Sequence, residues 1–189
     1  MEKKHTLTTR KIVFVALMAA LTGVGSALRI TLPISIAGTT SFHLGNIMCA
    51  LSGLLLGPWL GGLASGLGSM IYDMTNPLYL PECWVTFLTK GMYGLVAGLV
   101  AYAGHNKEWD GVKATLATTA AAVAYAVVYL AKTFFKNMVV KGLTADLAFI
   151  ALSEKVPATI FNAVVAVIFA PILGLAIRKA LRQNHLELN

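Results

Sequence analysis

Long apolar stretches, separated by short polar connections, dominate the chain. A helix that crosses the hydrocarbon core of a bilayer needs about 20 apolar residues, and most of these stretches reach that length. The stretch at 42–72 is too long for one crossing and contains Gly57 and Pro58. Proline removes a backbone donor and disfavours helix at the preceding residue, so two short helices joined by a tight turn are expected there. The predicted spans are residues 12–28, 42–56, 59–73, 84–103, 114–135 and 157–177.

The predicted fold is therefore all-α, a single transmembrane domain of six spans over residues 1–189. The connection at 30–41 contains Pro33 and Gly38 and alternates Thr, Ile and Ser, a pattern that favours an extended lid over a helix. A second polar connection covers 73–83. The connection that contains Lys141 and Asp146 is predicted to be a loop.

Composition and charge agree with a membrane chain. Hydrophobic residues make up 57% of the sequence and charged residues 12%, against about 25% charged in a typical soluble domain. The formal charge of +7 does not indicate nucleic acid, because the basic residues flank apolar segments instead of alternating with aromatic ones. Six spans place nine of the 15 Lys and Arg residues on the side of the two tails, which predicts cytoplasmic termini in a multi-pass protein of the plasma membrane. The other six are Arg29, Lys90, Lys132, Lys136, Lys141 and Lys155.

Three of these lysines fall inside predicted spans, where an ionisable residue usually faces a cavity or a partner. Tyr125, Tyr129, Lys132 and Lys136 follow one another at offsets of four, three and four, so they share a helical face near the outer end. The alternative is that both lysines extend to the lipid headgroups. Lys90 lies roughly 9 Å into its span at 1.5 Å per residue, which favours function or a buried pair with an acidic residue, Asp73 or Glu82.

Further polar residues are expected at the same outer level. His43 and Asn46 are predicted to share a face at the start of the second span, and Asn162 is a lone polar residue in the sixth. Each is either a ligand contact or an interhelical hydrogen bond, which is worth about 0.6 to 2 kcal/mol. We expect one extracellular-facing substrate site. Its candidate residues are His43, Asn46, Asp73, Asn76, Glu82, Trp84, Lys90, Tyr125, Tyr129, Lys132, Lys136 and Asn162.

The sequence contains no motif for covalent or metal-dependent chemistry. Neither a Walker A phosphate loop nor a metal-ligand spacing such as H-E-x-x-H occurs. Cys49 and Cys83 match no metal or redox motif and are expected to be unpaired. We therefore predict no enzyme activity, no metal site and no cofactor in this chain.

Two other classes of function remain open at this point. One is a small membrane enzyme that acts on lipid, with His43, Asp73 and Glu82 as acid, base or metal-ligating groups. The other is a structural subunit without a ligand, in which the lysines inside the spans pair with Asp73, Glu82 or Glu154.

Small residues four positions apart form a separate pattern, which allows helices to approach closely. The glycine pairs are interpreted as internal packing, whereas the alanine pair at the cytoplasmic end of the first span could face another protein. The pairs are Ala16 and Ala20, Gly53 and Gly57, Gly62 and Gly66, and Gly94 and Gly98.

The order of these features resembles a known family, the substrate-binding S components of energy-coupling factor (ECF) transporters. The resemblance covers about residues 12–181, nearly the whole chain. It rests on ALMAA at 16–20, FHLGN at 42–46, LLLGP at 54–58, GLG at 66–68 with Asp73, FLTKG at 87–91, GLVAG at 94–98, and Pro157 with Asn162.

The resemblance implies a prokaryotic protein that captures a water-soluble vitamin or its precursor at the outer face. Such proteins work with a transmembrane T component and two ABC ATPases, which use the ATP, and topple in the bilayer to deliver the ligand. The family's paired-alanine motif would assign the contact with the T component to Ala16 and Ala20. Its ligand site lies at the outer ends of spans four to six and in the loops after spans one, three and five.

The resemblance does not choose the ligand. The chain is most similar to the subgroup around riboflavin, hydroxymethylpyrimidine and pyridoxine-type substrates, and pantothenate fits the residues as well. Lysines favour a ligand with an anionic or strongly hydrogen-bonding group, because each offers three donors and a full charge. Tyr125, Tyr129 and Trp84 are candidates for stacking on a heteroaromatic ring.

Overall fold

The computed structural model describes residues 8–34, 38–104 and 109–186, and most of these residues are helical. Five helical stretches in the described part of the chain are long and apolar enough to cross a membrane, which confirms a mostly helical membrane architecture, although a two-stranded hairpin interrupts the predicted all-α fold. The elements in order are α1 (Thr9–Ala27), β1 (Arg29–Ile34), β2 (Gly38–His43), α2 (Gly45–Met74), the 3₁₀ turn η1 (Leu80–Glu82), α3 (Cys83–Ala101), α4 (Gly111–Val139), α5 (Ala145–Ser153) and α6 (Val156–Gln183).

The longest helix, α2, is folded back on itself at Gly57. This residue has φ 79° and ψ −177°, outside the helical region, and Pro58 follows it. Ser65 Oγ donates to the Cys49 carbonyl at 3.1 Å, although a straight helix would separate these two residues by about 24 Å. The predicted pair of antiparallel helices around a tight turn is therefore confirmed.

The turn leaves the Leu54 carbonyl without its helical donor, because the residue four positions later is Pro58. Trp109 Nε1 donates to this oxygen at 2.9 Å and Tyr102 Oη at 3.0 Å. Arg178 stacks over the Trp109 ring at 4.8 Å and donates to its backbone carbonyl at 2.8 Å. The indole thus ties the α3–α4 connection to the turn and to α6.

Glycines allow the backbones of α2 and α3 to pack directly against each other. A Cβ atom on Gly62 would lie 2.9 Å from the Gly91 carbonyl oxygen, and one on Gly66 would lie 2.8 Å from the Phe87 carbonyl oxygen. Real Cβ atoms essentially never come that close to backbone atoms. The interpretation of these glycines as packing residues is confirmed. A Cβ atom on Gly57, in contrast, would meet no atom within 4 Å, so this glycine serves the turn.

The predicted extended connection forms a β-hairpin. Its strands are antiparallel, with Arg29 opposite His43 and Thr31 opposite Ser41. The prediction that the second span begins at residue 42, with His43 and Asn46 on one helical face, was wrong, because strand β2 continues through His43 and α2 starts only at Gly45. The Leu44 N–H donates to the Gly25 carbonyl at 3.1 Å, which ties the base of the hairpin to the end of α1.

The predicted loop between the last two long helices was also partly wrong, because it contains the short helix α5. The sequence Ala145–Ser153 has neither Gly nor Pro. Asp146 lies in the first turn, where its negative charge interacts favourably with the positive end of the helix dipole. The helices on either side, α4 and α6, extend beyond the predicted spans 114–135 and 157–177.

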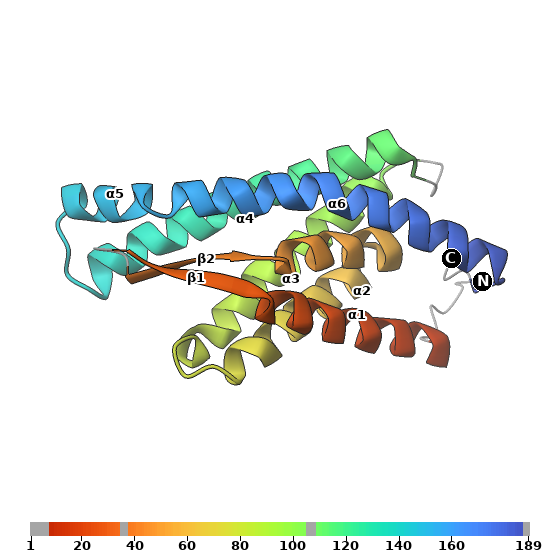
Figure 1. Ribbon diagram of the computed structural model, residues 1–189, viewed down its shortest axis with the longest axis horizontal. Helices are drawn as coiled ribbons and strands as arrows, with labels where there is room; N and C mark the ends of the chain where they lie inside the picture. The colour runs from red at the N-terminus through yellow and green to blue at the C-terminus, as the bar shows by residue number, and fades with distance from the viewer. Residues whose placement is uncertain (1–7, 35–37, 105–108, 187–189) are drawn as a thin grey trace, which may run out of the picture.

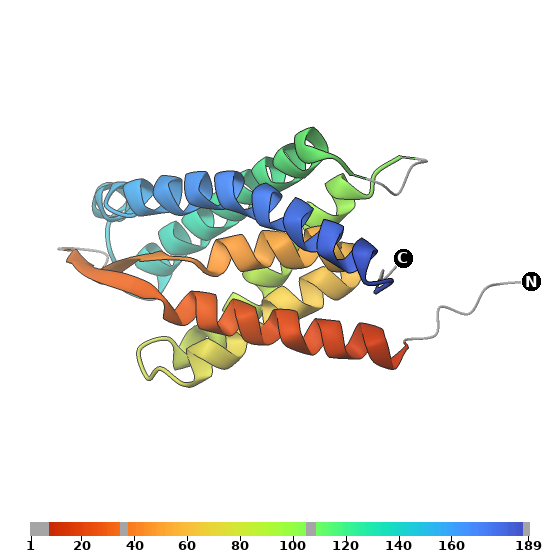
Figure 2. The same cartoon turned by 45° about the vertical axis from the view of Figure 1, so that its right-hand side comes forward.

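The helices of the bundle run between two ends of the molecule (Figure 1). The hairpin and α5 lie at one end, here called the hairpin end. The start of α1 and the finish of α6 lie together at the other end, here called the terminal end. The rotated view shows the same arrangement (Figure 2).

Candidate functional site

A cavity of about 320 Å³ lies at the hairpin end, which is within the usual size range of small-molecule sites. The hairpin, η1, α2, α3, α4 and α6 all contribute to its wall. Ten of the twelve residues that the sequence predicted for the site line this cavity. They are His43, Asn46, Asp73, Glu82, Lys90, Tyr125, Tyr129, Lys132, Lys136 and Asn162.

The two other predicted residues, Asn76 and Trp84, do not line the cavity. The side-chain oxygen of Asn76 accepts from the Leu78 N–H at 3.0 Å and so shapes the turn after α2. Trp84 is 63% exposed and lies one turn before the equally outward Leu88 on α3. Proximity in the sequence to Glu82 was misleading here, because the first turn of α3 points Trp84 away from the bundle.

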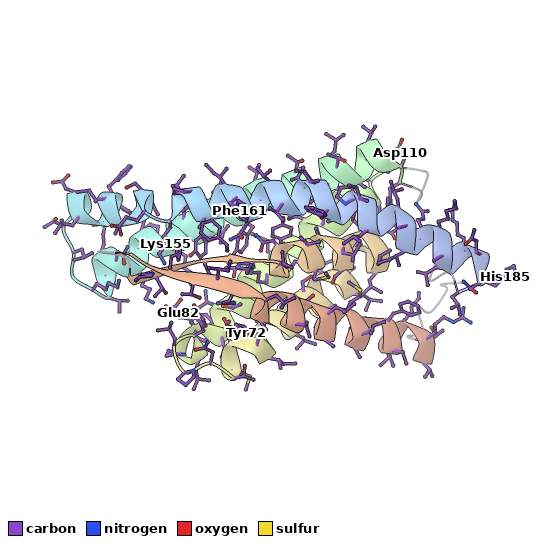
Figure 3. All side chains as sticks on the ribbon, viewed as in Figure 1. Tyr72, Glu82, Asp110, Lys155, Phe161 and His185 are labelled. Atoms are coloured by element: carbon purple, nitrogen blue, oxygen red, sulfur yellow. The ribbon has the colours of Figure 1, made fainter. Side chains whose placement is uncertain are left out.

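The two outer lysines of α4 meet a carboxylate. Glu82 accepts from Lys132 Nζ at 2.5 Å and also pairs with Lys136. Both lysines therefore line the cavity and share Glu82 as a partner. Figure 3 labels Glu82 and Lys155 at the hairpin end, whereas Asp110 and His185 lie at the terminal end.

Lys90 is only 6% exposed and is held where α2, α3 and α4 meet. Its amine donates to the Asn46 side-chain oxygen and lies 4.4 Å from the centre of the Tyr125 ring. A cation over an aromatic face is attracted by the ring quadrupole. The sequence offered a pair with Asp73 or Glu82, but the hydrogen-bond partner is an amide.

Aromatic rings form one side of the cavity. The Tyr125 and Tyr129 rings stack with centroids 5.7 Å apart and planes 17° apart. Tyr93 packs behind them, 5.5 Å from the Tyr125 ring centre. Both stacked tyrosines line the cavity, so this wall presents flat apolar surface beside the charged groups.

Asn162 uses both atoms of its amide to hold the hairpin. Its Nδ2 donates to the Ser41 carbonyl at 2.9 Å, and its Oδ1 accepts from the His43 N–H at 3.0 Å. Lys155 Nζ adds a bond to the Thr39 carbonyl at 2.9 Å. Strand β2 is thus fixed along α6, and Asn162 positions the wall of the cavity.

His43 completes the junction between the hairpin and α2. Its Nδ1 accepts from the Gly45 N–H at 3.2 Å, so a neutral ring carries its proton on Nε2. Burial, reinforced by the positive charges of Lys90 and Arg29, lowers the pKa of His43 well below its usual value. The ring is therefore a neutral part of the cavity wall near pH 7.

Sequence reasoning missed Arg29, which it treated only as the flank of the first span. Its guanidinium lies between two rings, 4.3 Å from the centre of Tyr72 and 4.7 Å from that of Tyr79, and its Nε donates to the Ser26 carbonyl at 2.7 Å. An arginine on the side that carries few basic residues was the available signal. Other polar lining residues missed as site members are Ser26, Thr39, Thr40, Ser41, Ser69, Tyr79, Thr86, Thr89, Thr133, Asn137, Lys141, Lys155 and Thr159.

The described residues contain no group of three or more His, Cys, Asp or Glu side chains that could hold a metal ion. Cys49 and Cys83 are both free thiols. The lining of the cavity offers hydrogen-bonding groups, positive charge and aromatic surface.

Comparison with family models places this arrangement in a known group. The model described as "ECF-type riboflavin transporter, S component" matches residues 6–179. The chain belongs to this family of ECF transporter S components. Among curated proteins, no match was found. This S component is thus a multi-pass membrane protein from a family of transporters and not from a family of enzymes.

The alanine pair of this S component lies on the outside of α1. Ala16 and Ala20 are both exposed, whereas Met18 and Ala19 between them are buried. The Ala19 carbonyl approaches Gly68 of α2 so closely that a Cβ on Gly68 would collide with it. The face that carries Ala16 and Ala20 is therefore left uncovered by the rest of the chain.

Proposed function

We propose that this S component captures a water-soluble vitamin or vitamin precursor from outside the cell and is the ligand-binding subunit of an ECF importer. The observation that carries the proposal is the cavity at the hairpin end. It is rich in hydrogen-bonding and charged side chains although the chain is mostly apolar. Polar groups inside a membrane protein are costly and are usually retained for function.

The proposed topology has six crossings, with the two halves of α2 counted separately and both termini in the cytoplasm. The terminal end carries Arg10, Lys11, Lys113, Arg178, Lys179 and Arg182 among the described residues, an excess of positive charge that is typical of the cytoplasmic side. The hairpin end, with its cavity, would then face outward.

Delivery requires other chains in this proposal. A transmembrane T component would dock against α1, and two ABC ATPases would supply the energy. The small side chains of Ala16 and Ala20 leave that face flat enough for a second helix to approach closely.

The ligand is proposed to combine a flat ring with polar substituents. A heteroaromatic ring would lie against Tyr125 and Tyr129, where aromatic stacking contributes beyond buried area. The name of the matching family model makes riboflavin a candidate. Hydroxymethylpyrimidine, pyridoxine and pantothenate are the others.

A binding screen of B vitamins and their precursors tests this proposal. The purified protein is titrated calorimetrically with each compound, alongside Tyr129→Leu and the matched variant Phe135→Leu, whose parent side chain is 64% exposed on the same helix. We expect one compound to bind with 1:1 stoichiometry to the wild type and to Phe135→Leu, and about tenfold more weakly to Tyr129→Leu. The absence of binding by every compound would refute the proposal.

A subunit without a ligand is the competing function, and the pairing of Glu82 with two lysines favours it. In that case Glu82→Gln would destabilise the protein and no vitamin would raise its melting temperature. Under our proposal, a bound vitamin raises the melting temperature of the wild type in proportion to the logarithm of its concentration.

A further inference from the structure

Basic residues are concentrated in the wall of the cavity. The six Lys and Arg residues that the proposed topology does not place on the side of the two tails all line the cavity. They are Arg29, Lys90, Lys132, Lys136, Lys141 and Lys155. In the described part of the wall, the acidic residues are Asp73 and Glu82. The cavity therefore concentrates positive charge far in excess of negative charge.

The two inner cations already have partners. Arg29 is enclosed by the rings of Tyr72 and Tyr79, and Lys90 is held by Asn46 and the ring of Tyr125. These contacts position both charges without using a ligand. The positive charge that a ligand could neutralise therefore lies on the four outer lysines, Lys132, Lys136, Lys141 and Lys155.

Two of the four lysines at the outer part of the cavity share one carboxylate of its wall. Glu82 pairs with Lys132 and Lys136. Lys155 experiences the positive charges of Lys132, Lys136 and Lys141, with the negative charge of Glu82 as the opposing influence. Uncompensated charge in a partly buried wall is expensive, whereas charge-assisted bonds to a carboxylate or phosphate are strong.

The helix dipoles at this place do not remove the excess. The C-terminus of α4 contributes about half a negative charge beside Lys136 and Lys141, and the N-terminus of α6 contributes about half a positive charge beside Lys155. The two contributions are opposite in sign and similar in size, and the short helix α5 between them adds a positive end after Lys141 and a negative end before Lys155, which also offset each other. The lysine side chains therefore dominate the local field.

Asn137 gives an independent sign of a missing acceptor. It is 2% exposed, lines the cavity, and its Nδ2 donor has no hydrogen-bond partner among the described residues. Buried donors are nearly always paired in native proteins. Its own backbone carbonyl accepts from the Leu143 N–H at 3.1 Å, which holds the turn that carries Lys141 beside it.

We propose that Lys132, Lys136, Lys141, Lys155 and Asn137 form a subsite for a carboxylate or phosphate group of the transported ligand. This rests on the proposed function and narrows it to anionic vitamins or precursors. The ring of the ligand lies on Tyr125 and Tyr129, and its anionic group points to the outer lysines. The ligand supplies the negative charge that Glu82 alone does not.

Matched pairs of neutral and anionic compounds test the subsite. Purified full-length protein in phosphatidylcholine nanodiscs is titrated with pantothenol and pantothenate, with riboflavin and riboflavin 5′-phosphate, and with pyridoxal and pyridoxal 5′-phosphate. We expect the anionic member of at least one pair to bind at least about tenfold more tightly than its neutral partner. The first pair reports on a carboxylate and the other two on a phosphate.

Variants locate the effect. Lys141→Ala and Lys155→Ala should each reduce that preference by about tenfold, whereas Lys179→Ala, an exposed lysine at the terminal end, should leave it unchanged. Melting temperatures within a few degrees of wild type show that the variants remain folded. Repeating the titration in nanodiscs with phosphatidylglycerol measures whether a lipid phosphate competes for the same lysines. A fall in affinity for the anionic compound there that occurs in the wild type and is absent from both lysine variants supports the subsite, whereas an equal fall in all three proteins counts against it.

Three results would overturn the inference. If the neutral member of each binding pair binds as tightly as the anionic one, the subsite fails while the proposed function stands. If the preference exists but survives both lysine substitutions, the anion is bound elsewhere. If no member of any pair binds, the subsite is wrong, and the wider screen of B vitamins and precursors decides the proposed function separately.

Discussion

The side-chain amide of Asn162 donates to the backbone carbonyl of Ser41 across 2.9 Å, which joins the sixth helix to the hairpin. The same amide accepts the His43 N–H at 3.0 Å. The rings of Phe42 and Phe161 meet edge to face beside it, with centroids 5.0 Å apart. One polar residue in an apolar helix thus determines where strand β2 lies over the cavity.

Replacing Asn162 should loosen this strand. In Asn162→Ala both bonds are lost, and at about 1 kcal/mol each this should weaken ligand binding roughly tenfold or more, mainly through faster dissociation. Stopped-flow binding measures the rate, and amide exchange at Thr39–His43 reports on the strand. Asn184→Ala, at the exposed end of α6, is the matched control and should bind as wild type. Equal dissociation rates in the two variants would contradict the role of Asn162.

Trp109 should stabilise the protein without affecting binding. Trp109→Phe keeps an aromatic ring for Arg178 but removes one of the two side-chain donors to the Leu54 carbonyl, at a cost of about 1 kcal/mol. For a chain of this size, that corresponds to a fall of about 2 to 4 °C in melting temperature. Trp59→Phe is the control, because Trp59 is 77% exposed. A smaller fall for Trp109→Phe than for Trp59→Phe would show that the bond to Leu54 contributes nothing.

His43 should make stability depend on pH in a defined direction. Its pKa is lowered in the folded protein, so between that value and about 6.5 the unfolded chain binds a proton that the folded chain does not. Its contribution is fully present above pH 6.5 and is lost as the pH falls below it. Melting temperatures from pH 7.5 to 5 should therefore decline less in His43→Asn than in the wild type, and His185→Gln should match the wild type. A steeper decline in His43→Asn would contradict the sign.

The uncovered face of α1 should matter for uptake and not for capture. Ala16→Trp or Ala20→Trp adds bulk where the T component is proposed to dock, so cellular vitamin uptake should fall at least tenfold while binding to the purified subunit stays unchanged. Ala176→Trp places the same bulk on an exposed position of α6. Wild-type uptake in the α1 variants, or an equal loss in Ala176→Trp, would reject α1 as the docking face.

Much of the fold could be predicted from sequence because apolar length and proline position are local properties. The break at Gly57 and Pro58 follows from the missing N–H of proline, and the extended connection follows from its alternation. The start of α2 could not be placed, because it depends on the Leu44 N–H reaching Gly25 at the end of another helix. Helix α5 was missed since its stretch is too short to be a span.

The site was predictable where charge stood out against apolar surroundings. Lys90, Lys132 and Lys136 were found because ionisable residues are rare inside spans. Their hydrogen-bond partners could not be predicted, because Glu82 lies 50 residues from Lys132 in the sequence. Arg29 and Asn137 were overlooked, since a flanking arginine and an asparagine near a helix end have ordinary structural explanations. Their roles depend on which helices meet at the hairpin end.

The most direct measurement is of what the protein carries when it is purified from cells. Protein is isolated from vitamin-rich cultures, denatured, and the released small molecules are identified by mass spectrometry. Thr159→Trp fills the cavity, at the loss of only a bond to its own helix, and Ala176→Trp is the control. The account predicts one vitamin or precursor, near one molecule per chain, from the wild type and the control and none from Thr159→Trp. Equal amounts from all three proteins, or no such molecule from any of them, would contradict capture in this cavity.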